Sequence, residues 1–155
     1  MSWTLDAVRH SSDKFSPSPV QGLNIGANEY IYVKPDEREK GDPNAAVQDW
    51  VARVLEVRAA DSSHVYLRIY WMYRPEDLPK GRQPYHGKNE LIASNRMDII
   101  EALTVENRVD VRRWEEKDDQ GELLEPTQLF WRQTLDFSKN KLSVILTLPI
   151  VSVHL

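Results

Sequence analysis

The sequence predicts a mostly-β domain with long loops, whose sheet is barrel-like and not a sandwich. Apolar and β-branched residues occur in short runs, one of these runs alternates with period two, and proline and glycine separate the runs. The chain has 155 residues, the length of one ordinary domain. We therefore expect a single domain with one sizeable core.

The first half of the chain holds the clearest strand patterns. Residues 1–20 are rich in serine, proline and charge, so we expect a flexible N-terminal arm before a domain that covers 21–155. Runs of β-branched and aromatic residues predict strands at 29–33 and 50–57. The clearest strand is 65–73, and a turn precedes it.

The strand at 65–73 has apolar side chains on both of its faces. Because strand side chains alternate with period two, Trp71 and Tyr73 share one face, and Met72 points to the other. A strand that is apolar on both faces is typical of the centre of a sheet. We therefore expect a central strand with a pair of aromatic rings near its end.

The second half alternates between loops and shorter strand patterns. Three prolines and two glycines in 74–88 predict a long ordered loop without regular structure. Residues 97–103 fit either one helical turn or a strand, and 142–155 fit a closing edge strand or a segment that is normally continued. Further strands are expected at 90–93, 109–114 and 129–135.

Charge and composition limit the partners. Asp and Glu number 24 against 20 Lys and Arg, a formal net charge of −4, which favours basic partners over nucleic acid. For Arg112, Arg113 and Lys117 a solvated strand face is a better explanation than direct DNA binding. The sequence has no cysteine, no signal-peptide core and no apolar run long enough to span a membrane. We expect a soluble intracellular protein.

The sequence has no recognisable catalytic or metal-binding motif. The four histidines lie far apart in sequence and form no ligand pair. The sequence has no Gly-x-Ser-x-Gly elbow, no phosphate loop and no dinucleotide-binding fingerprint. We expect no metal, no cofactor and no enzymatic activity.

The aromatic residues are the informative feature, with 5 Trp, 6 Tyr and 3 Phe. Judged by spacing alone, Trp71 and Tyr73 are more often a core pair than a site. The alternative is a cation site, for which Glu76 and Asp77 would supply acidic company. A trimethylammonium group donates no hydrogen bond, so aromatic ring faces recognise it best, at about 0.5–2 kcal/mol per contact. The pattern leaves both interpretations open.

Several linked segments resemble the central signature of the bromo-adjacent homology (BAH) family. Tyr-Trp-Met-Tyr-Arg-Pro-Glu-Asp at 70–77 is followed by Gly-Arg-Gln-Pro-Tyr-His-Gly-Lys-Asn-Glu-Leu-Ile-Ala-Ser-Asn at 81–95. The other matching segments are 49–54, 97–100 and 130–133. The resemblance covers about residues 25–140 and is closest to fungal and plant proteins that pair a BAH domain with a PHD finger. Here the chain ends without the cysteines of such a finger.

The resemblance implies a distorted β-barrel with long loops and few short helices, and a nuclear chromatin reader without catalysis. In similar readers an aromatic cage holds a trimethylated lysine of the histone H-three tail, the Polycomb-type repressive mark of gene silencing. Carried over to this sequence, the cage residues are Trp50, Trp71 and Tyr73, while Met72 belongs to the core. The implied partners are the methylated tail and the nucleosome.

Further residues are expected to contact the peptide: Glu76, Tyr85, His86, Asn95, Arg96 and Asp98. For His86 a structural hydrogen bond within the loop is an equal alternative. Arg96 stands where similar readers have histidine, and a cation beside a basic tail weakens binding or shifts specificity unless it points outward. The second hypothesis is therefore a BAH-fold scaffold that binds other chromatin proteins without selecting methyl-lysine.

Overall fold

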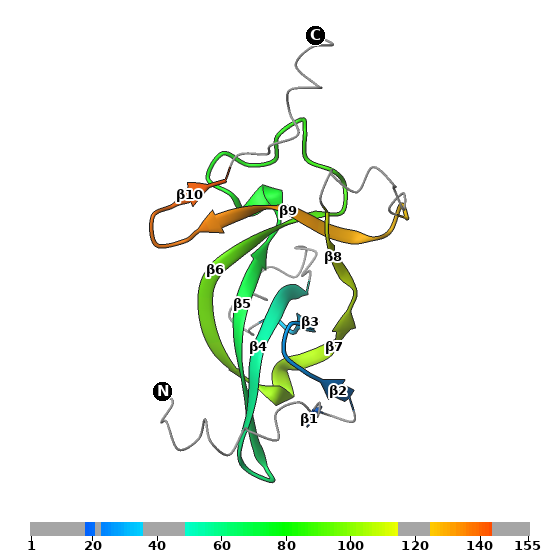
Figure 1. Cartoon of the computed structure of the whole chain (residues 1–155), viewed down its shortest axis with the longest axis vertical. Coiled ribbons are helices and arrows are strands. Elements are labelled where there is room, and N and C mark those ends of the chain that lie inside the picture. The colour runs from blue at the N-terminus through cyan, green and yellow to red at the C-terminus, as the bar shows by residue number, and fades with distance from the viewer. Residues whose placement is uncertain (1–17, 21–22, 36–48, 115–124, 144–155) are drawn as a thin grey trace. The chain divides into compact units, whose positions relative to one another are not determined.

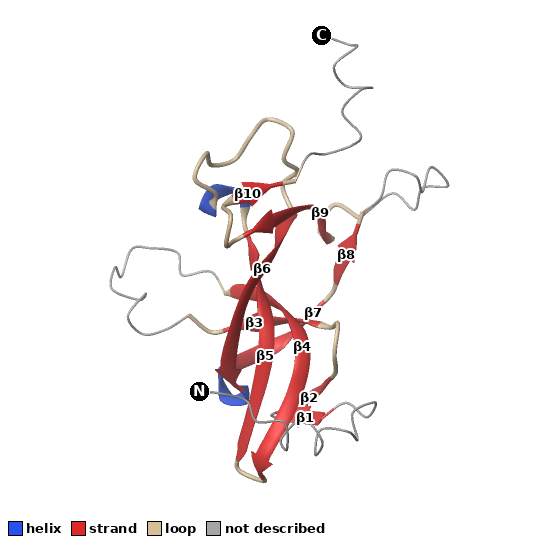
Figure 2. Cartoon of the chain, turned by 60° about the vertical axis from the view of Figure 1, so that its left-hand side comes forward, coloured by secondary structure: helices blue, strands red, loops and turns tan. Residues whose placement is uncertain are grey.

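Strands dominate the part of the chain that the computed structural model describes (Figure 1). The helical content of this part is two single turns of 3-10 helix, η2 (Pro75–Asp77) and η3 (Ala102–Thr104), which stand out against the strands in Figure 2. The predicted mostly-β class is confirmed. The described residues are 18–20, 23–35, 49–114 and 125–143.

The described chain divides into two compact units. The first unit contains the described residues up to Trp71 together with Met97–Val109. The second contains Met72–Arg96 together with the described residues from Asp110 onward. Strands β5 (His64–Tyr73) and β6 (Glu90–Glu101) each contribute residues to both units.

The first unit is built on antiparallel pairing. Strand β3 pairs antiparallel with both β4 and β7, and β4 lies beside β5, to which a tight turn connects it (Figure 1). A separate two-stranded ribbon pairs β1 with β2. The strands not yet delimited are β1 (Ser18–Val20), β2 (Leu23–Ile25), β3 (Tyr30–Val33), β4 (Trp50–Asp61) and β7 (Val105–Val109).

The core of this unit follows from the period-two pattern of its strands. Ala52 and Val54 on β4 and Leu67 and Ile69 on β5 are fully buried in one hydrophobic cluster. Burying a side chain of the size of valine, leucine or isoleucine stabilises the fold by roughly 1.5–3 kcal/mol. Both tryptophans of the predicted cage pack against this cluster, so the core fixes where their rings lie.

The second unit is built around β9 (Leu129–Asp136). Strands β6 and β8 (Val111–Arg113) pair with β9 in parallel, and β10 (Lys141–Leu142) pairs with it antiparallel. A small cluster of buried residues forms its core: Leu78, Ile92 and Leu135. The parallel pairing joins segments about 40 residues apart in sequence, which a hairpin turn cannot do.

The strand pairings also define the edges of the sheet. Among the described strands β7 pairs only with β3 and β10 only with β9, so the sheet has two edges and does not close into a barrel. The barrel-like expectation is therefore correct for the fold class, but the described sheet does not close into a barrel. None of the described helices is long and apolar enough to cross a membrane.

Several elements differ from the sequence-based expectation. Residues 74–88 were expected to lack regular structure, yet Pro75 begins the helical turn η2, because proline suits the first position of a helix. Residues 97–103 are strand as far as Glu101 and then enter η3. Of the arm predicted at 1–20, residues 18–20 form β1, and the rest lies outside the described residues. So does most of 142–155.

Candidate functional site

Two predicted cage residues lie next to each other in the first unit. Trp50 is the first residue of β4, and Trp71 lies near the end of β5, so both stand at the open end of this hairpin. Their ring centroids are 6.0 Å apart and the ring planes meet at 63°. Both rings are half-buried, with one side packed on the core cluster. They therefore form the rim of the core.

This angular arrangement suits a cation as well as a core contact. A cation is attracted to a ring face when it lies within about 6 Å of the centroid. The Trp50 and Trp71 centroids are 6.0 Å apart in an edge contact, so points within about 6 Å of both centroids lie beside the pair. The core holds both rings in place before any ligand arrives.

An acidic side chain is fixed at the edge of this pair. The indole Nε1 of Trp71 donates a hydrogen bond to Oδ2 of Asp98 over 3.2 Å, while Oδ1 accepts the backbone N–H of Ile99 at 2.7 Å. Asp98 is exposed. The carboxylate thus sets the orientation of one ring and adds negative charge beside it.

An acidic pair, Asp49 and Glu106, lies in the same unit, and Asp49 is the residue before Trp50. A hydrogen bond between the carboxyl groups of Asp49 and Glu106 raises the pKa of Glu106, and repulsion between the two charges acts in the same direction. Two carboxyl groups this close hold a proton in common more readily than two negative charges. Asp49 and Glu106 thus form an acidic pair in the first unit.

Tyr73, the third predicted cage residue, belongs to the second unit. It packs against the cluster formed by Leu78, Ile92 and Leu135. Its hydroxyl oxygen accepts a hydrogen bond of 3.0 Å from Nη1 of Arg96. Met72, in contrast, is 2% exposed, as expected for a core residue.

Arg96 and Asn95 turn toward the hairpin that joins β9 to β10. The guanidinium carbon of Arg96 lies 4.9 Å from the ring centroid of Phe137. The Asn95 amide donates to Asp136 at 3.2 Å and accepts the Phe137 backbone N–H at 2.7 Å. Asn95, predicted to contact the peptide, thus ties the hairpin to β6.

The acidic residue at the start of the long loop is paired within that loop. Glu76 forms an ion pair with Arg82, which also donates to the carbonyl oxygens of His86 and Gly87. Desolvation acts to raise the pKa of Glu76, but hydrogen bonding and charge attraction from Arg82 outweigh it, and the net pKa is lowered. Glu76 therefore holds the loop closed through Arg82.

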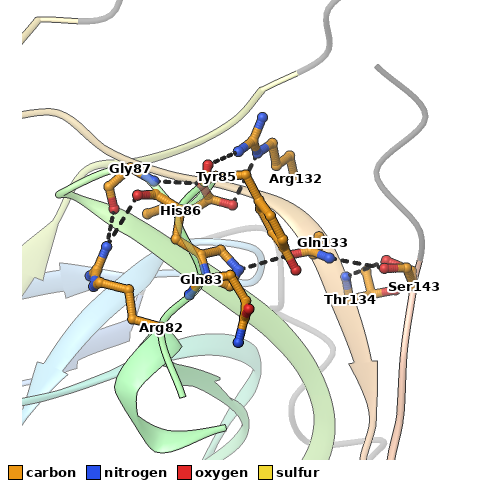
Figure 3. A network of polar contacts seen from close by, with 10 residues as sticks. Arg82, Gln83, Tyr85, His86, Gly87, Arg132, Gln133, Thr134 and Ser143 are labelled. Atoms are coloured by element: carbon orange, nitrogen blue, oxygen red, sulfur yellow. Dashed lines mark hydrogen bonds and ion pairs between the residues drawn. The ribbon is translucent and has the colours of Figure 1, made fainter. Parts of the chain in front are cut away.

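His86 is buried at 8% exposure and has a partner on each ring nitrogen (Figure 3). The backbone N–H of Gln83 donates to Nδ1 at 2.9 Å, which leaves the ring proton on Nε2. Nε2 then donates to Oε1 of Gln133 at 3.0 Å. Of the two alternatives for His86, the geometry is that of a structural hydrogen bond.

Tyr85 is more exposed than its neighbour and lies over it. Its ring centroid is 4.4 Å from that of His86, and 38% of the residue is exposed. Its carbonyl oxygen accepts a hydrogen bond from Arg132 of β9 at 2.6 Å (Figure 3). The backbone of Tyr85 is thus anchored to β9, while the residue stays partly exposed.

Sequence reasoning missed the polar residues that hold this loop on the sheet. Glu90 is 1% exposed, accepts the Gly87 N–H at 3.0 Å and pairs with Arg132 at 3.0 Å. Gln133 is 2% exposed and bridges His86 to the carbonyl oxygen of Ser143. The available signal was a glutamate directly before the apolar run 91–93.

The part of the chain that the structure describes has no set of side chains placed to bind a metal ion. No group of three or more His, Cys, Asp or Glu side chains there is arranged to hold a metal ion. What the described residues offer near the predicted site is aromatic rings, the Asp98 carboxylate and the exposed guanidinium group of Arg96.

Comparison with known proteins identifies the fold family. The family model described as the BAH domain matches residues 23–145. The chain belongs to the BAH domain family. The sequence-based resemblance, which covered about residues 25–140, is therefore confirmed.

Two curated plant relatives match this chain, both from Arabidopsis thaliana. "Chromatin remodeling protein EBS" is 30% identical over 91 residues, which cover 57% of this chain and 36% of the relative. "Chromatin remodeling protein SHL" is 36% identical over 90 residues, covering 57% and 37%. The matched segment is thus little more than a third of these relatives.

Solved structures support the fold independently. The crystal structure of the yeast Rsc2 BAH domain superposes with a TM-score of 0.59 and covers 87% of this chain and 56% of that one. The sequence identity is 14%, so this likeness concerns the fold alone.

Proposed function

We propose that this BAH domain binds a trimethylated lysine of the histone H-three tail and contributes to gene silencing. The observation that carries the proposal is the angled Trp50 and Trp71 pair with the Asp98 carboxylate at its edge. The rings supply faces for a cation that donates no hydrogen bond, and the carboxylate supplies charge. Tyr73 would be the third ring, because period-two alternation puts it on the same face of β5 as Trp71.

The names of the two plant relatives favour a role in chromatin. Both plant relatives are named as chromatin remodeling proteins, which favours a nuclear location and partners such as the nucleosome and other chromatin proteins. The BAH family is an interaction fold and not a known enzyme family. We accordingly propose binding without catalysis, and propose no direct contact with DNA.

Arg96 favours a second candidate, a scaffold without methyl-lysine selectivity. Its guanidinium binds the hydroxyl of the proposed third ring and places a positive charge there. Like charges repel a trimethylammonium group, so the cage would lose affinity. In that case the same surface would bind another chromatin protein.

Peptide titration separates the two candidates. Tail peptides that differ only in trimethylation of the lysine are titrated against the wild-type domain and against Trp50→Ala and Trp71→Ala. The proposal predicts preference for the trimethylated peptide and a loss of roughly two- to thirty-fold in each variant, since each ring contributes about 0.5–2 kcal/mol.

Trp131→Ala is the matched control. It removes a half-buried tryptophan of β9 in the second unit, outside the proposed cage, and is expected to keep the preference. Equal affinity of the wild-type domain for both peptides would contradict the proposal. Binding of a non-histone chromatin protein that survives loss of all three cage rings would favour the scaffold.

A further inference from the structure

Arg96 is an exposed cation held between aromatic side chains of the second unit. Nη1 donates to the Tyr73 hydroxyl at 3.0 Å, and the guanidinium carbon lies 4.9 Å from the Phe137 centroid. Phe137 itself is 48% exposed. A guanidinium group stacked on a ring keeps its plane and its remaining N–H groups oriented.

The hairpin that joins β9 to β10 carries Phe137, and it is anchored to β6, the strand that carries Arg96. Asn95 precedes Arg96 on β6, and its amide accepts the backbone N–H of Phe137 at 2.7 Å. The same amide donates to Asp136 at 3.2 Å. The backbone of Phe137 is therefore anchored to the strand that carries Arg96.

Arg96 differs from two other arginines of this unit in its partners. Arg82 pairs with Glu76, and Arg132 pairs with Glu90 at 3.0 Å. Within the described residues Arg96 forms no ion pair, and Nε and Nη2 have no acceptor. Its charge is thus held in place by neutral groups and remains available to an anion.

We infer that Arg96 is a specificity-determining residue, which with Tyr73 and Phe137 binds an anionic side chain of the bound peptide. The inference rests on the proposed function, because the peptide is the one whose methylated lysine that function assigns. A carboxylate or a phosphate has the required chemistry, since both accept two parallel N–H bonds from a guanidinium group.

Arg96 selects by repulsion as well as by attraction. A basic tail without an anionic side chain brings only positive charge to the uncompensated guanidinium group of Arg96, which disfavours binding. An anionic neighbour compensates that charge. The domain should therefore distinguish two peptides that carry the same methylated lysine.

The test uses a set of synthetic tail peptides. The lysine is trimethylated or unmodified, and a nearby residue is glutamine, glutamate, serine or phosphoserine. Affinities are measured for the wild-type domain, Arg96→Gln, Arg96→Lys and the control Arg108→Gln. Arg108 is an exposed arginine of the first unit, so the control loses the same charge elsewhere.

The expected result is a preference of about two- to five-fold for glutamate over glutamine, in the range of exposed ion pairs. Phosphoserine over serine should show a larger preference because it carries more charge. Arg96→Gln should abolish both preferences and strengthen binding of the neutral trimethylated peptide. Arg96→Lys should keep part of each preference, and Arg108→Gln should keep both.

Failures of the two proposals are distinguishable. Selectivity for trimethyl-lysine with no effect of the anionic neighbour, or with an effect that survives Arg96→Gln, would overturn the role of Arg96 alone. If only phosphoserine is preferred, the site is one for phosphate and the inference stands in that form. Loss of trimethyl dependence in every arm would overturn the proposed function, and the Arg96 inference with it.

Discussion

His86 and Gln133 bring complementary polar groups into the interior of the second unit. Nε2 of His86 donates to the Gln133 side chain, whose own amide donates to the Ser143 carbonyl oxygen at 3.0 Å. Both side chains are over nine-tenths buried. Buried polar groups of this kind are costly to leave without partners.

Gln133→Leu is therefore predicted to destabilise the domain. The substitution leaves the ring N–H of His86 and the Ser143 carbonyl oxygen without their partner, at a cost of about 1–3 kcal/mol. Urea unfolding measures the loss. Gln128→Leu is the comparison, because Gln128 is only half-buried and donates to backbone carbonyl oxygens near the start of β9. Equal stability of Gln133→Leu and the wild-type domain would contradict this account.

Some residue roles could be predicted and others depended on distant partners. Alternation on one strand was enough to assign Met72 to the core. The contact of Trp50 with Trp71 came from the family resemblance, because spacing alone did not bring them together. Glu90 was missed because its partner Arg132 lies 42 residues away, and only the parallel pairing of β6 with β9 joins them.

At the scale of elements, the loop between η2 and β6 is held by close packing against β9. A Cβ atom on Gly87 would lie 3.0 Å from Cζ of the Phe130 ring. That ring also makes an edge contact with Trp114, their centroids 5.9 Å apart. Little room remains for the ring to move.

Gly87→Ala is predicted to destabilise the domain by about 1 kcal/mol or more, because the methyl group overpacks this contact. Gly26→Ala is the matched control, since nothing lies within 4 Å of its Cβ position. Thermal unfolding of both variants measures the difference in their melting temperatures. A melting temperature of Gly87→Ala equal to that of the control would show that Phe130 moves freely.

The turn between β9 and β10 depends on the ionised form of Asp136. Hydrogen bonds from Ser138, Asn95 and the Lys139 backbone lower the pKa of Asp136 below its ordinary value of 3.8. Ionisation is thus easier in the folded state than in the unfolded state. The stabilisation is present at pH values above 3.8 and is lost as the pH falls through the lowered pKa.

Asp136→Asn should therefore lower the melting temperature at neutral pH, and the difference from wild type should shrink below about pH 4. Thermal unfolding between pH 7 and pH 2.5 measures this. Asp110→Asn removes an exposed carboxylate elsewhere in the same unit and serves as the control. A difference that stays constant with pH would exclude ionisation as the cause.

The strand positions were largely predictable, because β-branched runs and period-two alternation are local properties. Strand lengths were less so: β4 continues to Asp61 and β6 to Glu101, well past their apolar runs. Their polar ends are held by neighbouring strands, which the local sequence does not reveal. The parallel pairing on β9 had no local signal.

At the scale of the whole molecule, two properties are informative: the family of the chain and its net charge. The chain belongs to the BAH family and carries a formal net charge of −4, which favours a basic partner. The proposed site in the first unit joins the angled Trp50 and Trp71 rings with the Asp98 carboxylate. The barrel-like prediction was correct in class, and the two sheet edges at β7 and β10 account for the lack of closure.

The central claim is that aromatic faces recognise the charge of a trimethylammonium group and not only its shape. A peptide in which a neutral tert-butyl group replaces the trimethylammonium group tests this directly, because the two groups have nearly the same size. Calorimetric titration should give an affinity at least about three-fold weaker for the neutral peptide, since the ring quadrupoles no longer attract it. Equal affinity for the two peptides would contradict recognition of charge by the Trp50 and Trp71 pair.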